Sequence, residues 1–350
     1  MTDTPARSAP APLVLREQAP PQLEATLEAL DGQPVTPVES FYVRSHAGTP
    51  RIDPHAWRLA IGGGVRAERR LTLEALRALP AHEQAVTLEC AGNGRTAFDP
   101  PAPGIPWGPG AVGTARWSGV RLADVLDLAG VAGDAAHAWF EGADLGGSGA
   151  PCFVRSLPLA LARERVLLAT HMNGDPLTPD HGAPLRAIVP GWYAMASVKW
   201  LTRISLEPMP APGPEMTQSY CYWREHADGW RATPVTEIRV KALITRPLDG
   251  ARVPAGTVRV AGFAWSAGPV ARVQVAADGA PWRDAALEPA IGAYAWRAWH
   301  AELTLAPGAH TIAARATDAA GATQPERVDW NRDGYGANAV TRVAVTVVPA

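Results

Sequence analysis

Hydrophobic and polar positions follow two different patterns, and the change comes near residue 236. Between Phe41 and about Glu207, short apolar runs typical of strands alternate with short runs of helical periodicity. The alternation is too irregular for a doubly wound sheet, so this part is expected to form an α+β domain. We expect strands at 41–46, 57–63, 85–90, 137–142, 186–191 and 198–206, and helices at 72–80, 119–130 and 156–163.

Beyond about Thr236 the apolar positions recur with a period of two. Val343, Val345 and Val347 point to one side and the residues between them to the other, which is typical of a half-buried strand. Asp-Gly and Pro-Gly turn signals separate the runs, so the pattern predicts an all-β, antiparallel, immunoglobulin-like sandwich. Its strands are expected at 241–247, 257–266, 270–278, 296–305, 310–318 and 340–348.

Proline-rich segments divide the chain. Residues 1–37 are rich in Pro and Ala with little periodicity, and we expect them to form an arm. Pro208–Met216 marks a boundary, because proline can neither continue a helix nor donate a ladder hydrogen bond. The expected organisation is an arm (1–37), a first domain (38–210), a linker (211–235) and a second domain (236–350).

Composition excludes several classes of protein. Of 350 residues, 47% are hydrophobic and 19% charged, which excludes a largely disordered chain. The net charge of −2 argues against a broad basic surface, so no nucleic-acid partner is expected. No apolar stretch reaches the roughly 18 residues of a helical membrane span. The sequence shows no export signal, which predicts a cytoplasmic protein and leaves a processed periplasmic form open.

The three cysteines cannot form a disulfide framework, and one of them stands out. Cys90 follows an apolar run and precedes the glycine-rich AGNGR, so its thiol is expected where a strand ends and a loop begins. Arg95 nearby would favour the thiolate. The alternative is a buried structural cysteine, because free cysteine is often buried. Cys152 and Cys221 are expected to be inert.

Six segments together carry a family resemblance. In order and spacing they resemble the molybdenum-cofactor domain of the sulfite oxidase family, and the C-terminal AGFAWS and YAWRAW resemble that family's dimerisation domain. Any one segment alone would be a weak signal, and the resemblance covers about 38–350. The segments are SFYVRSH (40–46), TLECAGNGR (87–95), GAVGTARWSGVRLADVL (110–126), FEGAD (140–144), MNGDPLTPDHGAPLRAIVPGWY (172–193) and SVKWL (197–201).

The resemblance implies one molybdenum–molybdopterin cofactor per chain. No haem is expected, because the sequence has no CxxCH motif and its N-terminal arm is short for a haem domain. Cys90 would be the metal ligand, a soft thiolate beside the two dithiolene sulfurs of the pterin. A phosphorylated cofactor requires charge-assisted donors, which explains why basic residues recur in these segments. The implied cofactor-binding residues are Tyr42, Arg44, His46, Cys90, Asp144, His181, Arg186, Ser197, Val198 and Lys199.

The resemblance also implies a small basic substrate site beside the metal. Sulfite and sulfate carry up to two negative charges, and several guanidinium groups would compensate for their desolvation. Besides Cys90, the implied catalytic residues are Arg44, Arg95, Trp107 and, reaching across from the second domain, Arg297.

Three departures from the family pattern bear on the substrate. Gly94 takes the place of a second arginine, and Ser45 that of an asparagine. Counting from the SYCYW stretch places Asp228 where sulfite oxidases carry an active-site tyrosine, and its negative charge would repel sulfite. If an insertion shifts the register, Tyr220 or Tyr222 fills this role.

The leading hypothesis is a homodimeric sulfite oxidase or dehydrogenase that passes electrons to an external acceptor, a cytochrome or dioxygen. One alternative keeps the cofactor and changes the substrate to another oxyanion or a sulfoxide. Another is a cysteine-nucleophile hydrolase that pairs Cys90 with His181. A binding module built on the sandwich is a third, and it leaves the N-terminal motifs unexplained.

Overall fold

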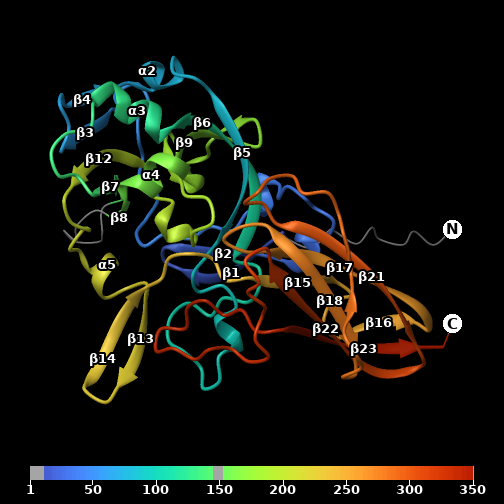
Figure 1. Cartoon of the computed structure of the whole chain (residues 1–350). Coiled ribbons are helices and arrows are strands. Elements are labelled where there is room, and N and C mark those ends of the chain that lie inside the picture. Colours follow the sequence, from blue (N-terminus) through green and yellow to red (C-terminus); the bar gives the residue numbers. More distant parts are fainter. Residues whose placement is uncertain (1–11, 145–152, 350) are drawn as a thin grey trace, which may run out of the picture.

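The computed structural model describes residues 12–144 and 153–349, and strands dominate it (Figure 1). Helices occur only before residue 236 in this described part, and the longest, α3 (Leu122–Ala129), has eight residues. The α+β prediction therefore holds in a coarse form: short helices accompany the sheets of an N-terminal unit, residues 12–207, and strands build a C-terminal unit, residues 236–349.

Ten strands of the N-terminal unit form two sheets: β3 (Leu59–Gly63), β4 (Arg69–Leu71), β5 (His82–Glu89), β6 (Val112–Arg121), β7 (His137–Gly142), β8 (Val154–Pro158), β9 (Leu167–Met172), β10 (Asp175–Pro176), β11 (Arg186–Ile188) and β12 (Leu201–Glu207). One sheet has the order β10-β9-β6-β5, with β11 also paired to β9. The other has the order β4-β3-β12-β7-β8, in which β3 and β12 are parallel and the other pairs antiparallel.

The helices α2 (Leu73–Arg77), α3 and α4 (Leu159–Arg165) pack against these sheets. Helix α3 shows why the sequence predicted it, because its apolar residues recur on one face at helical spacing. These buried residues are Leu122, Val125, Leu126 and Ala129.

Residues 13–30, expected to belong to an arm, are part of the described fold. They form the hairpin β1 (Leu13–Gln18) and β2 (Pro21–Ala25), followed by α1 (Leu27–Leu30). Buried Glu24 accepts hydrogen bonds from the amides of Gly108 and Gly110, at 2.9 and 2.8 Å. The hairpin is thereby fixed to the loop that precedes β6.

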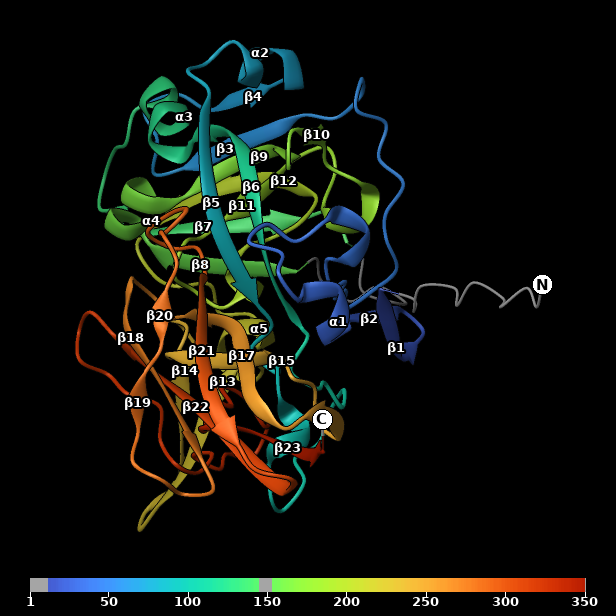
Figure 2. The same ribbon diagram turned by 90° about the vertical axis from the view of Figure 1, so that its right-hand side faces the viewer.

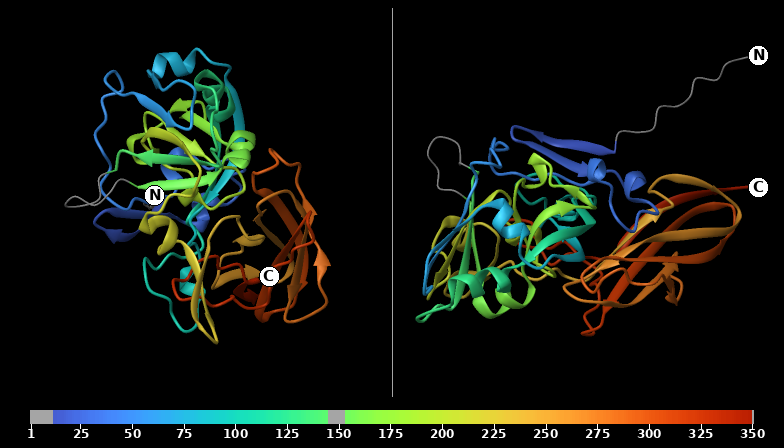
Figure 3. Two further views of the ribbon diagram at one scale, coloured as in Figure 1. Left: turned by 60° about the vertical axis from the view of Figure 1, so that its left-hand side comes forward. Right: turned by 90° about the horizontal axis from the view of Figure 1, so that it is seen from above.

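The C-terminal unit consists of two packed sheets, and its strands are β15 (Lys241–Arg246), β16 (Ala251–Pro254), β17 (Gly256–Trp265), β18 (Val270–Ala277), β19 (Arg283–Asp284), β20 (Ala286–Leu287), β21 (Arg297–Leu305), β22 (Gly308–Asp318) and β23 (Thr341–Val348). Their orders are β15-β17-β21-β20 and β16-β23-β22-β18-β19. Each of the six strands expected from the alternating pattern is present, and Val343, Val345 and Val347 face the core as predicted. Figure 3 shows this unit, in orange and red, beside the N-terminal unit.

Other expectations differ from the structure. Residues 41–46 form no strand and carry only a bridge between Val43 and Leu23. Strands β6 and β9 were not expected, and β6 ends inside the predicted helix 119–130. Both are buried along most of their length, so their sequences lack the period of two that marks a half-exposed strand.

The segment 211–235, expected to be a linker, contains regular structure. It holds α5 (Pro214–Thr217) and a hairpin of β13 (Cys221–His226) and β14 (Gly229–Pro234), seen in yellow in Figure 1. Ala227 and Asp228 make the turn, and Gly229, the first residue of β14, has a φ of 120° that favours glycine; Asp228 and Gly229 form an Asp-Gly pair in the sequence. This pair is the signal that identifies the hairpin in the sequence.

The two units share a buried cluster. Strand β5 runs from the N-terminal unit towards β15 and β17 (Figure 2). The Trp296 amide donates to Thr87 Oγ1 on β5 at 2.6 Å, and the Thr87 amide donates to the Tyr294 carbonyl at 2.9 Å. Residues beside this contact are therefore held jointly by both units. In the described part of the chain, no helix is long and apolar enough to cross a membrane.

Candidate functional site

Cys90 lies where the sequence places it, immediately after β5. Its amide donates to the Ala111 carbonyl at 2.9 Å, and its carbonyl accepts from the Asn93 amide at 2.9 Å. Burial raises the pKa of the thiol, whereas Arg44, the Gly92 amide and Arg95 oppose that rise. Cys90 is 9% exposed and lines two cavities. A purely structural cysteine would instead be enclosed by packed side chains.

The first cavity, called the inner pocket here, brings together residues that are far apart in the sequence. They come from the segment 41–46, the end of β5, η4 (Pro179–His181), β11 and the residues after η5 (Ala194–Ala196). All ten residues that the resemblance implied for cofactor binding line it: Tyr42, Arg44, His46, Cys90, Asp144, His181, Arg186, Ser197, Val198 and Lys199.

Positive charge gathers in the inner pocket. The Arg186 guanidinium donates to the carbonyls of His181 and Ser197, at 3.0 and 3.2 Å, and burial lowers its pKa to about 10. Lys199 Nζ donates to Ser45 Oγ at 2.8 Å and to the Asp180 carbonyl at 2.9 Å. Burial and then the charge of Arg186 lower the pKa of Lys199 to about 7. An anionic ligand in the pocket would relieve this repulsion.

Two histidines of the inner pocket are neutral near pH 7. Burial, followed by the charges of Arg44 and Lys199, lowers the pKa of His46 to about 3. Burial and the charge of Arg186 lower that of His181 to about 4. Within the described residues no hydrogen bond joins His181 to Cys90; His181 Nε2 lies 3.4 Å from the Val38 carbonyl. The hydrolase pairing of Cys90 and His181 therefore lacks support.

The pKa shifts predict that the cofactor-free protein loses stability in mild acid. Between about pH 6.5 and 4, His46 and His181 are protonated in the unfolded chain but not in the folded chain. The unfolded state therefore binds more protons, and the free energy of unfolding decreases as the pH is lowered. When the pH is lowered from 6.5 to 5, we expect the free energy of unfolding to decrease by up to about 2 kcal/mol for each histidine. Urea unfolding at both pH values measures it, and a His181→Gln variant should lose part of the dependence. His226→Gln, in the exposed hairpin, is the control; an equal dependence in all three proteins would contradict the prediction.

The second cavity, called the outer cleft here, lies on the other side of Cys90. It has a volume of about 490 Å³, ample for a small oxyanion, and shares Arg44, Cys90 and Tyr220 with the inner pocket. Cys90 therefore stands at the junction of the two cavities. The other charged and aromatic residues that line the outer cleft are Glu17, Arg95, Trp107, Arg332, Asp333 and Tyr335.

Arg95 is fixed at the floor of the outer cleft. Its Nη1 donates to the Ile105 carbonyl at 2.9 Å, and its Nε donates to the Gly334 carbonyl at 3.3 Å. A Cβ at position 92 would lie 2.7 Å from the guanidinium, so Gly92 of the AGNGR loop provides the space that Arg95 occupies. Trp107 is 1% exposed and forms part of the wall.

Two expectations about the substrate side are corrected. Arg297, which was expected in the substrate site, lines neither cavity. It lies on β21 and donates to the carbonyls of Glu288 and Val270, at 2.7 and 3.3 Å. Asp228, expected at the tyrosine position, lies in the exposed turn of the β13–β14 hairpin, 2.5 Å from Arg231. The short turn and the hairpin carry residue 228 away from the cleft.

Arg332 and Tyr220 take the places expected of these residues. Arg332 reaches the outer cleft from the loop that precedes β23, where it pairs with Asp333 at 3.0 Å. Of the two tyrosines that a shifted register allowed, Tyr220 lines both cavities and Tyr222 lines neither. The Tyr220 Oη lies within hydrogen-bond distance, 2.7 Å, of His46 Nε2. Tyr220 has a φ of 53°, a strained backbone of the kind that clusters at functional sites.

Besides Arg332, sequence reasoning missed Tyr335 and Arg155. Tyr335 stacks on Tyr220 with 5.3 Å between ring centroids, and the Arg95 guanidinium lies 5.3 Å from its ring. Its signal was the polar, glycine-containing NRDGYG (331–336), which interrupts the alternating pattern of the sandwich. Arg155, on β8, is buried and lies 5.4 Å from the Tyr220 ring. The hydrophobic pattern of the β8 sequence does not predict this contact between Arg155 and Tyr220. Cys152 lies outside the described residues, and Cys221 lines neither cavity.

Two family models match the chain in sequence order. An oxidoreductase molybdopterin binding domain matches residues 46–215, and a Mo-co oxidoreductase dimerisation domain matches residues 232–348. Among solved structures, the sulfane dehydrogenase SoxCD from Paracoccus pantotrophus is similar with a TM-score of 0.83 and 26% identity, covering 100% of this chain and 90% of that one.

Curated relatives agree with these matches. The mitochondrial sulfite oxidase of Mus musculus is 38% identical over 96% of this chain, which spans 66% of that protein's length. The sulfite oxidase of Gallus gallus is 37% identical over 92% of this chain and 75% of its own length. Three features point to the same family: the order of the two matched domains, the extent of these identities, and the ten residues that line the inner pocket. The chain belongs to the sulfite oxidase family of molybdopterin oxidoreductases.

Proposed function

We propose that the protein oxidises sulfite to sulfate at a molybdenum cofactor and passes the electrons to an external acceptor. The observation that carries this proposal is the position of Cys90 between the two cavities, with the inner pocket lined by cationic groups and the outer cleft by three arginines. The relatives whose names contain sulfite oxidase support the choice of substrate.

The residues of the inner pocket fit a phosphorylated pterin. Among the described residues, two buried polar atoms of the inner-pocket lining, Asp144 Oδ1 and Arg186 Nε, have no hydrogen-bond partner. A pterin offers ring donors to a carboxylate, and a phosphate offers acceptors to a guanidinium and an ammonium. Arg186, Lys199 and His181 would hold the phosphate end, and Asp144 would bind a pterin N–H. When bound, the cofactor supplies two-electron redox chemistry and oxygen transfer.

Cys90 would hold the metal, and the chain around it would orient that bond. A thiolate is a soft ligand suited to a metal already bound by dithiolene sulfurs. The described residues contain no group of three or more His, Cys, Asp or Glu side chains able to hold a metal ion. A single protein ligand therefore matches a metal whose other ligands come with its organic carrier.

The outer cleft would bind sulfite. Arg44, Arg95 and Arg332 line it, and guanidinium groups compensate for the desolvation of an oxyanion. Tyr220 is placed at the junction by its hydrogen bond to His46, where its hydroxyl can also contact a substrate oxygen. Asp333 lowers the net positive charge of the cleft by pairing with Arg332, which suits an anion that must leave after turnover.

Further proposals concern the assembly. The match to a dimerisation domain supports a homodimer with one cofactor per chain. The two packed sheets of the C-terminal unit support an immunoglobulin-like sandwich, and the matched ranges support a cofactor domain of about 38–210 and a second domain of about 236–350.

Steady-state assays with sulfite and a one-electron acceptor test the proposed function. Arg332→Met should raise KM for sulfite about tenfold or more, because a hydrogen bond to a charged group contributes roughly 1.5–3 kcal/mol. Arg297→Met, which removes an arginine that lines neither cavity, is the matched control and should leave KM unchanged. Absence of sulfite-dependent reduction by the molybdenum-loaded protein would refute sulfite as the substrate, and reversed effects of the two variants would refute the assigned cleft.

A further inference from the structure

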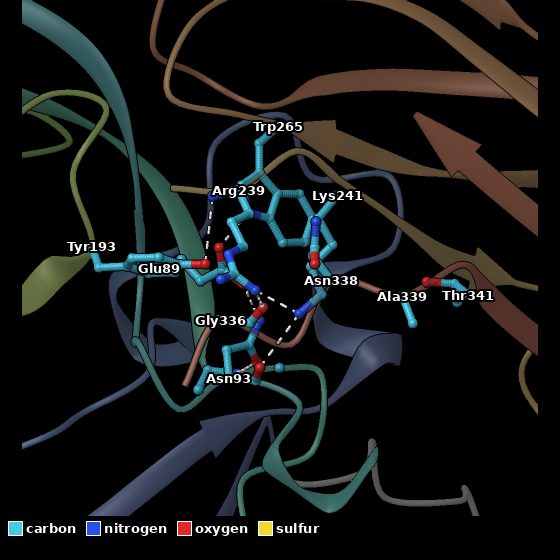
Figure 4. Close-up of polar contacts among 12 residues, drawn as sticks. Glu89, Asn93, Tyr193, Arg239, Lys241, Trp265, Gly336, Asn338, Ala339 and Thr341 are labelled. Atoms are coloured by element: carbon cyan, nitrogen blue, oxygen red, sulfur yellow. Dashed lines mark hydrogen bonds and ion pairs between the residues drawn. The ribbon is translucent and has the colours of Figure 1, made fainter. Parts of the chain in front are cut away.

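Glu89, the residue before Cys90, lies at the centre of a buried polar cluster (Figure 4). Its Oε1 accepts hydrogen bonds from Asn93 Nδ2 at 2.9 Å and from Lys241 Nζ at 3.2 Å. Its Oε2 accepts from Trp265 Nε1 at 2.8 Å. Glu89 is 1% exposed, so these three donors replace the water that its carboxylate loses on folding.

Two of the three donors come from the C-terminal unit. Lys241 begins β15 and Trp265 ends β17, and the two residues are directly opposite each other in the antiparallel register. Lys241 Nζ also lies 3.4 Å from the Asn93 carbonyl. The edge of the C-terminal sheet thus presents one ammonium and one indole N–H to the chain on both sides of Cys90.

The cluster is connected to the Cys90 backbone through Asn93. Asn93 Oδ1 accepts from the Ala111 amide at 3.0 Å, and the Ala111 carbonyl accepts from the Cys90 amide at 2.9 Å. The Asn93 amide in turn donates to the Cys90 carbonyl. Asn93, which Glu89 and Lys241 hold, therefore binds the Cys90 carbonyl directly and the Cys90 amide through Ala111.

We infer that Glu89, Lys241 and Trp265 form a positioning cluster through which the C-terminal unit sets the place of the Cys90 thiol between the inner pocket and the outer cleft. None of the three lines either cavity, so they act through Cys90 and do not touch substrate. The inference rests on the proposed ligand role of Cys90 and gives the C-terminal unit a second task beside dimerisation.

A merely structural ion pair between the units would stabilise the fold without controlling the position of the Cys90 thiol. A second ion pair between the units, far from Cys90, provides the control that distinguishes a structural role from a positioning role. Arg246, at the other end of β15, pairs with Asp31 of the N-terminal unit, away from residues 89–94. Lys241→Met and Asp31→Asn each break one ion pair between the units. Lys241→Arg is the conservative variant that keeps a donor and a charge.

The first readout is the alkylation rate of Cys90 by iodoacetamide in the cofactor-free, full-length protein, followed by peptide mass spectrometry to exclude the other cysteines. Lys241→Met should raise the alkylation rate about tenfold, because the loop that follows Cys90 would open more often once it is loosened. Asp31→Asn should change it less than about twofold, and Lys241→Arg should restore most of the wild-type rate. Equal rates in wild type and Lys241→Met would overturn the inference, as would equal effects of Lys241→Met and Asp31→Asn.

The second readout uses the cofactor-loaded enzyme. Lys241→Met should lower kcat roughly 10–100-fold, the effect typical of groups that orient a metal ligand, with KM for sulfite within about twofold. A change confined to KM would contradict the positioning role. Failure of the proposed function is distinguishable, because an enzyme without molybdenum or sulfite turnover leaves the alkylation result unaffected.

Discussion

Cys90→Ser should abolish sulfite oxidation and leave the fold intact. A serine hydroxyl stays protonated near neutral pH and is a hard oxygen donor, so it cannot replace a soft thiolate on molybdenum. The loss in kcat should exceed the roughly 100-fold that follows removal of an outer-shell partner, because the ligand itself is lost. The midpoint of thermal unfolding of the cofactor-free protein should barely change, since the side chain at position 90 borders two cavities where a hydroxyl meets water.

Cys221→Ser is the matched control for this variant. Cys221 is also buried, but it is the first residue of β13, its Sγ lies 3.5 Å from the Ser219 carbonyl, and it lines neither cavity. We expect wild-type turnover from this protein. If Cys90→Ser kept more than a small part of its activity, or if both serine variants lost activity equally, the ligand role of Cys90 would be wrong.

Arg186→Met should empty the inner pocket of cofactor without unfolding the chain. Arg186 is buried, its Nε has no hydrogen-bond partner among the described residues, and burial lowers the pKa of its guanidinium to about 10. A buried charge of this kind costs stability until an anion arrives, so its loss should change the unfolding temperature of the cofactor-free protein little. The pterin and molybdenum content of protein from a cofactor-producing host should fall about tenfold or more, because a charge-assisted contact to phosphate is lost.

Arg186→Lys distinguishes charge from geometry. The lysine keeps the charge but cannot donate to both the His181 and the Ser197 carbonyls while facing the pocket, so an intermediate cofactor content is expected. Full cofactor content in Arg186→Met would contradict the assignment of the inner pocket. A collapse of the cofactor-free methionine variant would show instead that the arginine is needed for folding.

The sequence predicted the strands whose side chains alternate and the residues carried by ordered motifs. The valines of β23 repeat every second residue because one face is buried, and this local signal needs no knowledge of the partner strand. The ten residues of the inner pocket were found because their segments keep the order and spacing of a known family. Neither inference required long-range contacts.

Contacts between distant segments were harder to predict. Arg297 lies in a motif that resembles the family, yet its strand position directs it to the Glu288 carbonyl, and Arg332 reaches the outer cleft from a loop without strand periodicity. Counting residues to Asp228 failed because this residue lies in the exposed turn of the β13–β14 hairpin. Likewise, Lys241 is 152 positions from Glu89, and only the packing of β15 against the end of β5 brings them together.

Metal and pterin analysis of the full-length protein, purified from a host that makes the molybdenum cofactor, tests the central claim most directly. We predict one molybdenum and one pterin per chain in the wild type and neither in stoichiometric amount in Arg186→Met. Wild-type protein that is folded and contains no molybdenum would contradict the account, whatever its activity.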